Sequence, residues 1–281
     1  GSAGFDGVAY RRIWPHTGPM ESGEQHVESG SFRIHREKAL EKLGKYQLPN
    51  PWEFAAAWAR LAVDSGASYV EAGSDGDSSV LSFDGRPVPE GVLLDPLSAL
   101  FGEEAGDPRG RVLAVGFLAL LRLRPAGVVI ASGGRTWVHD PVKGDSAERT
   151  GRVPRTGMRV VWDGSVRANS GHFVREFKSV LALADIEVRA AGPGTRDRGG
   201  SWLRTSLDTG ALMCARRARG ADSGMVSVHC RGVRGYKAAH ATLDGFEVLV
   251  RDDALQLDFT GCQLARDLRF EETVRQAVRS A

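Results

Sequence analysis

The residues of this chain that are best suited to nucleophilic or metal chemistry lie close together near its end. Ser227, His229 and Cys230 are residue types that serve in nucleophilic catalysis and in zinc binding. A zinc site needs a second pair of ligands at metal spacing, and His229-Cys230 has none. The Gly-x-Ser-x-Gly turn of the α/β-hydrolases is missing, and His240 stands alone. We therefore expect no metal site and no catalytic residues of these types.

Two further patterns suggest chemistry but have simpler explanations. Asp252-Asp253 and Glu271-Glu272 are adjacent acids that fall at a strand end and in a helix, where such pairs usually face solvent. The glycine-rich segment 191–200 is superficially like a phosphate loop, but no apolar helix opens directly after it. A flexible linker is the better interpretation. An unrelated α/β enzyme stays a hypothesis, but the sequence does not show a nucleophile together with a base and an orienting acid.

The composition is that of a globular protein, with 42% hydrophobic and 26% charged residues in 281. A formal net charge of +2 is too small to indicate a nucleic-acid partner. No apolar run approaches the roughly 18 residues that a membrane span requires, and no signal peptide is visible. The three cysteines are widely spaced and odd in number, which favours a reducing compartment, the cytoplasm.

One helix is especially well marked at both ends. Asn50 is a good N-cap, Pro51 suits the first helical position, and Glu53 completes an Asn-x-x-Glu capping arrangement. Apolar residues then recur with the helical period to about Ser65. Gly66 is placed to end the helix in the left-handed conformation. The sequence thus predicts a helix over 50–65.

The remaining periodicities predict alternating helices and strands. Residues 1–30 lack periodicity and predict a flexible N-terminal arm or a fusion remnant, and 191–200 predicts a linker. Helices are expected at 34–48, 93–101, 111–123, 172–184 and 271–280, and strands at 68–72, 79–83, 127–131, 135–139, 158–162, 186–190, 211–216, 225–231 and 246–251. The predicted fold is α/β, of the α+β two-layer type. A mixed, mostly antiparallel sheet packs on helices over 31–190, and a smaller α+β domain follows over 201–281.

The order of elements over 31–190 resembles the nucleotide-binding domain of the GHKL ATPases, which include gyrase, heat-shock chaperones, histidine kinases and MutL. The helix and strand over 172–190 resemble the heat-shock chaperone (HtpG-like) branch. Residues 201–281 resemble a shortened middle domain of that branch. The resemblance implies a fold in which ATP and magnesium would lie between the sheet and its helices.

The family's catalytic motif is a helical Glu followed four residues later by an Asn. The matching run here is AWARLAVDSGA, in which Ala57 takes the place of the Glu and Leu61 that of the Asn. The Glu is a general base and the Asn holds magnesium, so the resemblance implies that both functions are lost. A second motif, Asp-x-Gly-x-Gly after a strand, matches FDGRP, where Phe83 replaces the Asp that recognises adenine.

Other positions of the resemblance retain residues that nucleotide could contact. The candidates are Arg60, Asp64, Asp84, Gly85 and Gly116. Each also has a structural interpretation. Arg60 and Asp64 would be surface charges of the helix, Asp84-Gly85 a turn, and Gly116 a site of close helix packing.

These substitutions lead us to expect a catalytically degenerate protein. It would act as a structural or protein-interaction module, as a subunit of a larger assembly, without a required cofactor. The alternative is a chaperone-like or switch protein that binds ATP through non-standard contacts. Protein partners or self-association are expected rather than nucleic acid or membrane. Trp52, Trp137 and Trp202, together with the N-terminal arm, are candidate partner surfaces, with burial in the core as the alternative for all six tryptophans.

Overall fold

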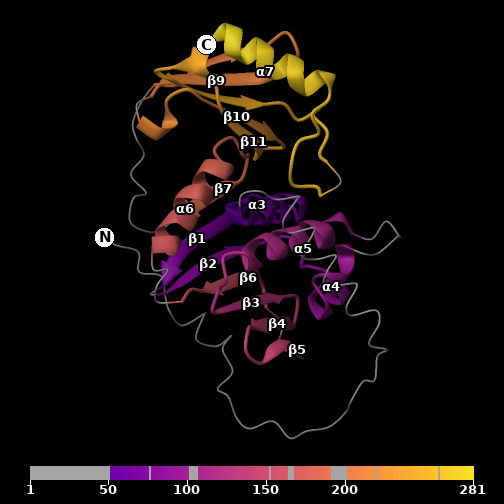
Figure 1. The fold of residues 1–281 in the computed structure, drawn as a ribbon. Coiled ribbons are helices and arrows are strands. Elements are labelled where there is room, and N and C mark those ends of the chain that lie inside the picture. Colours follow the sequence, from indigo (N-terminus) through magenta and orange to yellow (C-terminus); the bar gives the residue numbers. More distant parts are fainter. Residues whose placement is uncertain are drawn as a thin grey trace, which may run out of the picture.

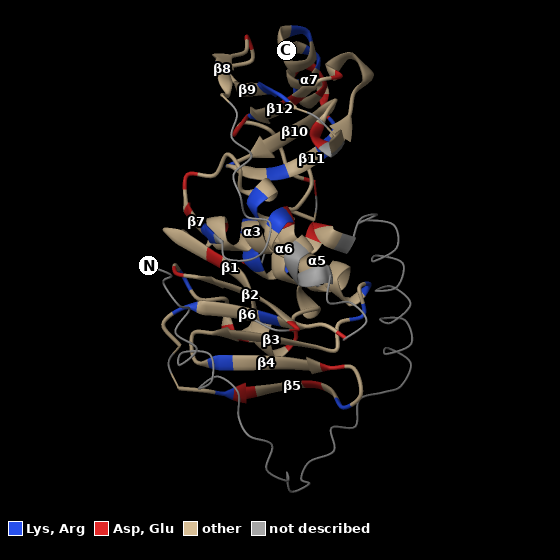
Figure 2. Ribbon diagram, turned by 90° about the vertical axis from the view of Figure 1, so that its left-hand side faces the viewer, with Lys and Arg blue, Asp and Glu red and all other residues tan. Residues whose placement is uncertain are grey.

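The computed structural model of the chain describes residues 51–75, 77–100, 107–151, 153–163, 168–190, 201–218, 220–258 and 260–281. The described residues form two mixed, mostly antiparallel sheets packed with helices, which confirms the predicted α+β fold class. The sheets lie toward opposite ends of the molecule, with α3 and α6 between them (Figures 1 and 2). The predicted arm, the helix over 34–48 and the linker over 191–200 lie outside the described residues.

The first sheet has seven strands in the order β5-β4-β3-β6-β2-β1-β7. Its strands are β1 Tyr69–Asp75, β2 Ser78–Phe83, β3 Gly127–Ser132, β4 Arg135–Asp140, β5 Gly144–Arg149, β6 Thr156–Val161 and β7 Glu187–Ala190. All neighbours pair antiparallel except β1 and β7, which are parallel. A parallel neighbour requires a crossover, and α6 (Ala168–Val180) lies in the connection that ends in β7.

Helices α3 (Phe54–Asp64), α5 (Pro108–Leu121) and α6 cover one face of this sheet (Figure 1). A one-turn 3-10 helix, η1 (Pro51–Glu53), leads into α3. The aromatic rings of Phe54 and Phe173 stack with centroids 5.5 Å apart, and Trp58 meets Phe54 edge-on at 5.2 Å. Nearly every residue of α3 is buried, because α5 and α6 flank it and the sheet lies beneath it. Among the described residues, no helix has both the length and the apolar character that crossing a bilayer requires.

The ends of α3 test the predicted caps. Gly66 has φ 71°, and the Ala67 and Gly66 N–H groups donate to the Ala62 and Val63 carbonyls at 3.1 and 2.9 Å. These two bonds form a Schellman motif, so the predicted left-handed stop at Gly66 is confirmed. Asn50 lies outside the described residues, and Glu53 makes no side-chain cap bond.

A predicted helix over 93–101 is wrong as a single element. The chain forms α4 (Glu90–Leu94) and a short 3-10 helix, η2 (Ser98–Leu100), with a break at Asp95. Asp95 has φ −145° and ψ 87°, because the ring of a following proline, Pro96, excludes the helical conformation from the preceding residue. Three strands were also not predicted, namely β5, β8 (Leu203–Ser206) and β11 (Val233–Ala239).

The second sheet has five strands in the order β11-β10-β12-β9-β8. Its other strands are β9 Leu212–Arg217, β10 Met225–Cys230 and β12 Phe246–Arg251. Helix α7 (Leu268–Ser280) packs on one face, over β10 and β12. Buried Phe270 and Ala277 of α7 join Met213, Val226 and Val248 of the sheet in a second apolar core. Short 3-10 helices over Gly220–Asp222 and Ala241–Leu243 flank β10 and β12.

The turn between β10 and β11 joins the two sheets. Val233, at the start of β11, belongs to the apolar core of the first sheet rather than to that of the second. Arg234 forms an ion pair with Glu176 of α6, and its guanidinium donates to the Ser179 hydroxyl at 2.7 Å. Arg251 bridges to Asp185 at 2.6 Å. The junction thus combines an apolar contact at the turn with polar contacts made by Arg234 and Arg251.

We predict that Gly232→Ala weakens this junction. Gly232 has φ 75°, and a Cβ there would lie 2.4 Å from Ala184 Cα, which is backbone and cannot move aside. We expect the free energy of unfolding to fall by about 2–4 kcal/mol in urea denaturation.

Gly210→Ala is the matched control. Gly210 has a similar φ of 82°, but no atom lies within 4 Å of its Cβ position. It therefore carries only the left-handed penalty of about 1–2 kcal/mol. Equal losses in the two variants would show that the contact with Ala184 contributes nothing.

Candidate functional site

The space between α3 and the first sheet is filled with side chains. The three positions that the resemblance assigned to the general base, the magnesium ligand and the adenine-reading acid are Ala57, Leu61 and Phe83. Each side chain is 0% exposed and belongs to the first apolar core. A phosphate or adenine group would have to displace these side chains, so the arrangement at these positions is that of a packed interior.

Gly116 brings α5 against α3. A Cβ at Gly116 would lie 2.8 Å from Ala57 Cβ and 2.9 Å from Trp58 Cδ1. The two helices therefore touch at this point, as the packing interpretation of Gly116 predicts. Trp58 is 0% exposed, and its indole nitrogen has no hydrogen-bond partner among the described residues.

Asp84 and Gly85 hold the chain between α3 and β1. The Asp84 carboxylate accepts hydrogen bonds from Ser68 N at 2.8 Å, Ser68 Oγ at 2.5 Å and Tyr69 N at 3.1 Å. Partial burial would raise the pKa of Asp84, but these bonds outweigh it and lower the pKa. Gly85 has φ 99°, and a Cβ there would lie 2.7 Å from Ser65 O. The pair thus makes structural contacts of its own.

Arg60 is not the surface charge that its place on the helix suggested. Its side chain is 0% exposed, because the β10–β11 turn covers that side of α3. Nη2 reaches the Val233 carbonyl at 3.5 Å, while Nε and Nη1 have no partner within the described ranges. Burial lowers the pKa of this guanidinium. Asp64 is half-buried, with Arg231 Nη1 3.9 Å from its carboxylate, and burial raises its pKa.

His229 is a second buried polar group at the same junction. Its ring is 0% exposed, Nδ1 lies 3.4 Å from the Gly232 carbonyl, and Nε2 has no partner in the described part of the chain. Burial lowers the pKa of His229 to about 3, against a smaller opposing effect of the Gly232 bond. Arg234, Arg60 and Arg251 lower it further. The imidazole is therefore neutral at physiological pH.

Other sequence candidates fall inside the cores. Ser227 and Cys230 are buried with His229, and Cys214, Cys230 and Cys262 are all free thiols. Trp137, expected at a partner surface, is 1% exposed against Phe117, so that prediction is wrong. Trp52 is only partly buried but packs against the first core beside Trp162. Trp202 remains half-buried, with the Arg216 guanidinium 4.5 Å above its ring.

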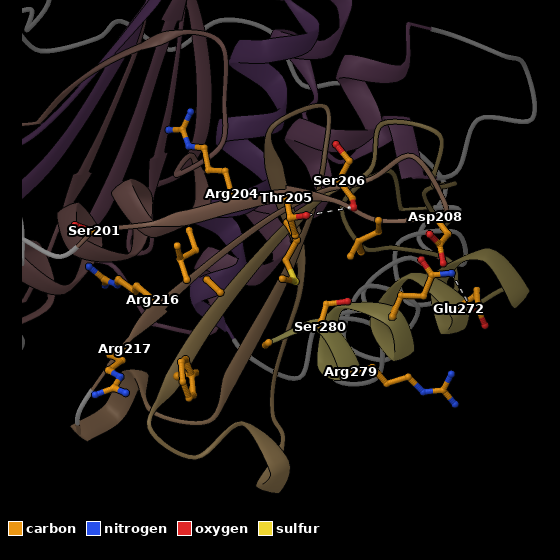
Figure 3. A pocket seen from close by; sticks show the side chains of 17 residues that line it. Ser201, Arg204, Thr205, Ser206, Asp208, Arg216, Arg217, Glu272, Arg279 and Ser280 are labelled. Atoms are coloured by element: carbon orange, nitrogen blue, oxygen red, sulfur yellow. Dashed lines mark hydrogen bonds between the residues drawn. The ribbon is translucent and has the colours of Figure 1, made fainter.

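A groove of about 1090 Å³ lies on the second sheet beside α7. Its floor is formed by β8, β9 and the first residue of β12, and α7 forms one wall (Figure 3). Apolar floor residues are Leu203, Met213, Ala215 and Phe246. The groove exists because α7 covers β10 and β12 and none of the described helices covers the β8–β9 side of the same face.

Arginines line the groove. Arg204, Arg216 and Arg217 lie on its strand side and Arg279 on the α7 side (Figure 3). Arg216 is bonded to Glu247 at 2.7 Å, whereas Arg204, Arg217 and Arg279 are exposed and form no ion pair with any described residue. The acids on the lining are Asp208 and Glu272, and Glu272 bonds Arg275 and Gln276 of its own helix.

Polar contacts fix the groove's wall to its floor. Buried Asp252 accepts from Arg269 Nε and Nη2, both at 2.9 Å, and from the Thr273 hydroxyl at 3.3 Å. Arg269 Nη2 also donates to the Thr209 carbonyl at 3.0 Å in the β8–β9 turn. Thr209 N donates to Gln276 at 3.3 Å. Helix α7 is therefore held in place at the end of the groove where β8 turns into β9.

Sequence reasoning missed this groove because β8 carries no clear strand signal. Its four residues, Leu203–Ser206, are all exposed, so burial imposes no alternation on them. The one available signal was the following Asp-Thr-Gly, a turn sequence in front of a predicted strand.

Neither a family of known proteins nor a curated relative matches the chain.

We predict that His229 makes the protein sensitive to acid. Below about pH 6.5 the unfolded state gains a proton on His229 that the folded state, with a pKa of about 3, does not take up. The free energy of unfolding should then fall by up to about 1.4 kcal/mol per pH unit as the pH drops toward 3. His229→Gln removes this contribution, so urea denaturation between pH 7.5 and 4 should show a flatter profile.

His240→Gln is the control, because His240 lies outside the junction and bonds Thr242 at 2.8 Å. Its profile should match that of the unmodified protein. Parallel profiles for the His229 variant and the unmodified protein would contradict the prediction.

Proposed function

We propose that this chain is a non-catalytic protein-interaction module, built on a GHKL-like scaffold of the heat-shock chaperone type. The observation that carries the proposal is the complete burial of Ala57, Leu61 and Phe83 in one apolar core. Support for the scaffold comes from the order of elements, in which α3, the β1–β2 hairpin, α5 and α6 follow one another as the resemblance implies.

The chemistry of these three positions argues against ATP hydrolysis. A positioned general base contributes about 10²–10⁴ in rate, and an alanine supplies none. Magnesium takes oxygen ligands, which leucine lacks. Phe83 cannot accept a hydrogen bond from adenine. Since the three side chains also pack together, the substitutions are mutually consistent with a closed interior.

An ATP-binding switch is the alternative function. It would use Arg60, Asp64, Asp84, Gly85 and Gly116, and the buried Arg60 guanidinium favours it to the extent that two of its nitrogens have no partner among the described residues. Access to Arg60 would require movement of the β10–β11 turn away from α3. In this structure the five residues contact different parts of the protein. An ATP site that used all of them would therefore require a different conformation.

A reducing compartment such as the cytoplasm is part of the proposal. It is supported by three buried cysteines that are all free thiols. A protein partner is part of the same proposal. A fold without catalytic residues would act by binding other proteins through its surface.

We predict that Mg-ATP leaves the melting temperature unchanged. A ligand at 100 times its Kd adds about 2.7 kcal/mol to the stability of the folded state. In a protein of this size each kcal/mol shifts the melting temperature by about 2–4 °C. Binding would therefore give a shift of several degrees in differential scanning fluorimetry, and we expect none up to millimolar Mg-ATP.

Two observations would overturn the proposal. One is a saturable shift with ATP that an unrelated nucleotide does not produce. The other is stoichiometric nucleotide released from the purified protein on denaturation. Either result would favour the switch protein instead.

A further inference from the structure

Among the described residues, no strand pairs with the outer side of the second sheet beside the groove. Strand β8 is the terminal strand, and it pairs with β9 in antiparallel register from Leu203↔Ala215 to Ser206↔Leu212. The Leu207 N–H donates to the Ala211 carbonyl at 2.8 Å, which marks 207 and 211 as a hydrogen-bonded pair. Because such pairs alternate along an antiparallel ladder, the N–H and C=O groups of Arg204 and Ser206 face away from β9.

The face next to this edge is apolar at its centre and cationic at its ends. Leu203 pairs with Ala215 and Thr205 with Met213, so these side chains share the groove face of the sheet. Leu203 is 75% exposed, although it is a leucine in a strand. Arg217 and Arg279 stand on opposite sides of this apolar centre (Figure 3).

We infer that this groove binds an extended, acidic peptide of a partner protein, which adds a sixth strand to the sheet along β8. The inference deepens the proposed interaction role and rests on it for the kind of partner. The peptide backbone would bond the outward groups of Arg204 and Ser206, as in other cases of β-strand addition. Apolar side chains would lie over Leu203 and Met213, and carboxylates would face Arg217 and Arg279, whereas the Arg204 side chain lies on the opposite face of the sheet, beside Cys214.

Charge decides between an acidic partner and other occupants. Two exposed arginines of the groove face, Arg217 and Arg279, form no ion pair with any described residue and meet one acid without a described ion pair, Asp208, so the groove carries an excess of positive charge. A second copy of β8 would bring another Arg204 to the same edge, which opposes pairing of identical strands.

One of the two terminal strands of the first sheet, β5, gives a useful contrast. Strand β5 ends that sheet and has the sequence GDSAER, with Asp145, Glu148 and Arg149 along it (Figure 2). Mixed charges of this kind discourage pairing with another strand. Strand β8 has a single charged residue, Arg204, and an exposed leucine beside it. Strand β5 is therefore better protected against pairing with another strand than β8 is.

The test is fluorescence anisotropy with a labelled peptide that has three central valines flanked by two glutamates on each side. We expect saturable binding to the full chain that weakens as salt rises, because the arginine contacts are screened. Arg217→Gln with Arg279→Gln should raise Kd about 2–25-fold, since each exposed charge contact is worth roughly 1.4–5-fold. Arg149→Gln, on the other sheet's edge, should leave Kd unchanged.

A backbone variant separates strand addition from simple charge attraction. Ser206→Pro removes one outward N–H without touching the bonds to β9, and proline is tolerated on an edge strand. We expect Kd to rise about 2–13-fold, as for the loss of one hydrogen bond, with an unchanged circular dichroism spectrum.

Several results would overturn the inference. These are no saturable binding of the acidic peptide, equal binding of a peptide with lysines in place of glutamates, or an Arg149→Gln effect as large as that of the double variant. Tighter, Arg217-dependent binding of single-stranded oligothymidine than of the peptide would assign the groove to nucleic acid instead. The two proposals are tested separately. A failure to bind the peptide would not change the interpretation of the Mg-ATP experiment, and a melting-temperature shift with ATP would not change that of the peptide experiment.

Discussion

The contact between α3 and α5 at Gly116 sets the limits of what the first sheet can do. The helices approach so closely because neither Gly116 nor Ala57 has a side chain beyond Cβ. Trp58, Leu61 and Phe83 then close the space below, all 0% exposed. Burying each such large side chain contributes about 1.5–3 kcal/mol. Separating the helices enough to admit a nucleotide would expose several of them, at a cost comparable to the whole stability of a domain, about 5–15 kcal/mol.

Elements that depend on local sequence signals could be predicted, whereas parts of the candidate site that depend on contacts between distant residues could not. Helix α3, its stop at Gly66, the β1–β2 hairpin and α7 are specified by local signals, namely caps, periodicity and turn residues. Arg60 was misjudged because helix periodicity reports how apolar positions recur, not what later covers a polar one. The covering residue, Val233, lies 173 positions further along the chain. Strands β5 and β8 were missed because their exposed residues need not alternate.

The junction between the two sheets combines firm packing with poorly satisfied polar groups. Val233 and Cys262 enter the first core, while Arg60 and His229 keep nitrogens without partners among the described residues. A buried group that lacks a hydrogen bond costs about 1–3 kcal/mol, and more when it is charged. The ion pair of Arg251 with Asp185 offsets little of this cost, because Asp185 is 79% exposed and such pairs are worth about 0–1 kcal/mol. The apolar contact at the β10–β11 turn, together with the largely buried Arg234–Glu176 pair, therefore stabilises the junction.

The same reasoning locates the surface where this chain has room for a partner. The helix face of the first sheet is closed by three helices, and α3 is buried on nearly every side. The second sheet has five strands but a single helix of 13 residues on the face described. That helix is fixed by Asp252 and by the β8–β9 turn, so it cannot shift to cover the remaining strands without breaking those bonds. Within the described part of the chain, an apolar floor without a covering helix, an edge without a partner strand and arginines without ion pairs thus meet beside β8. They result from the same placement of α7, which contacts β10 and β12 and leaves the β8–β9 side of that face without a described helix.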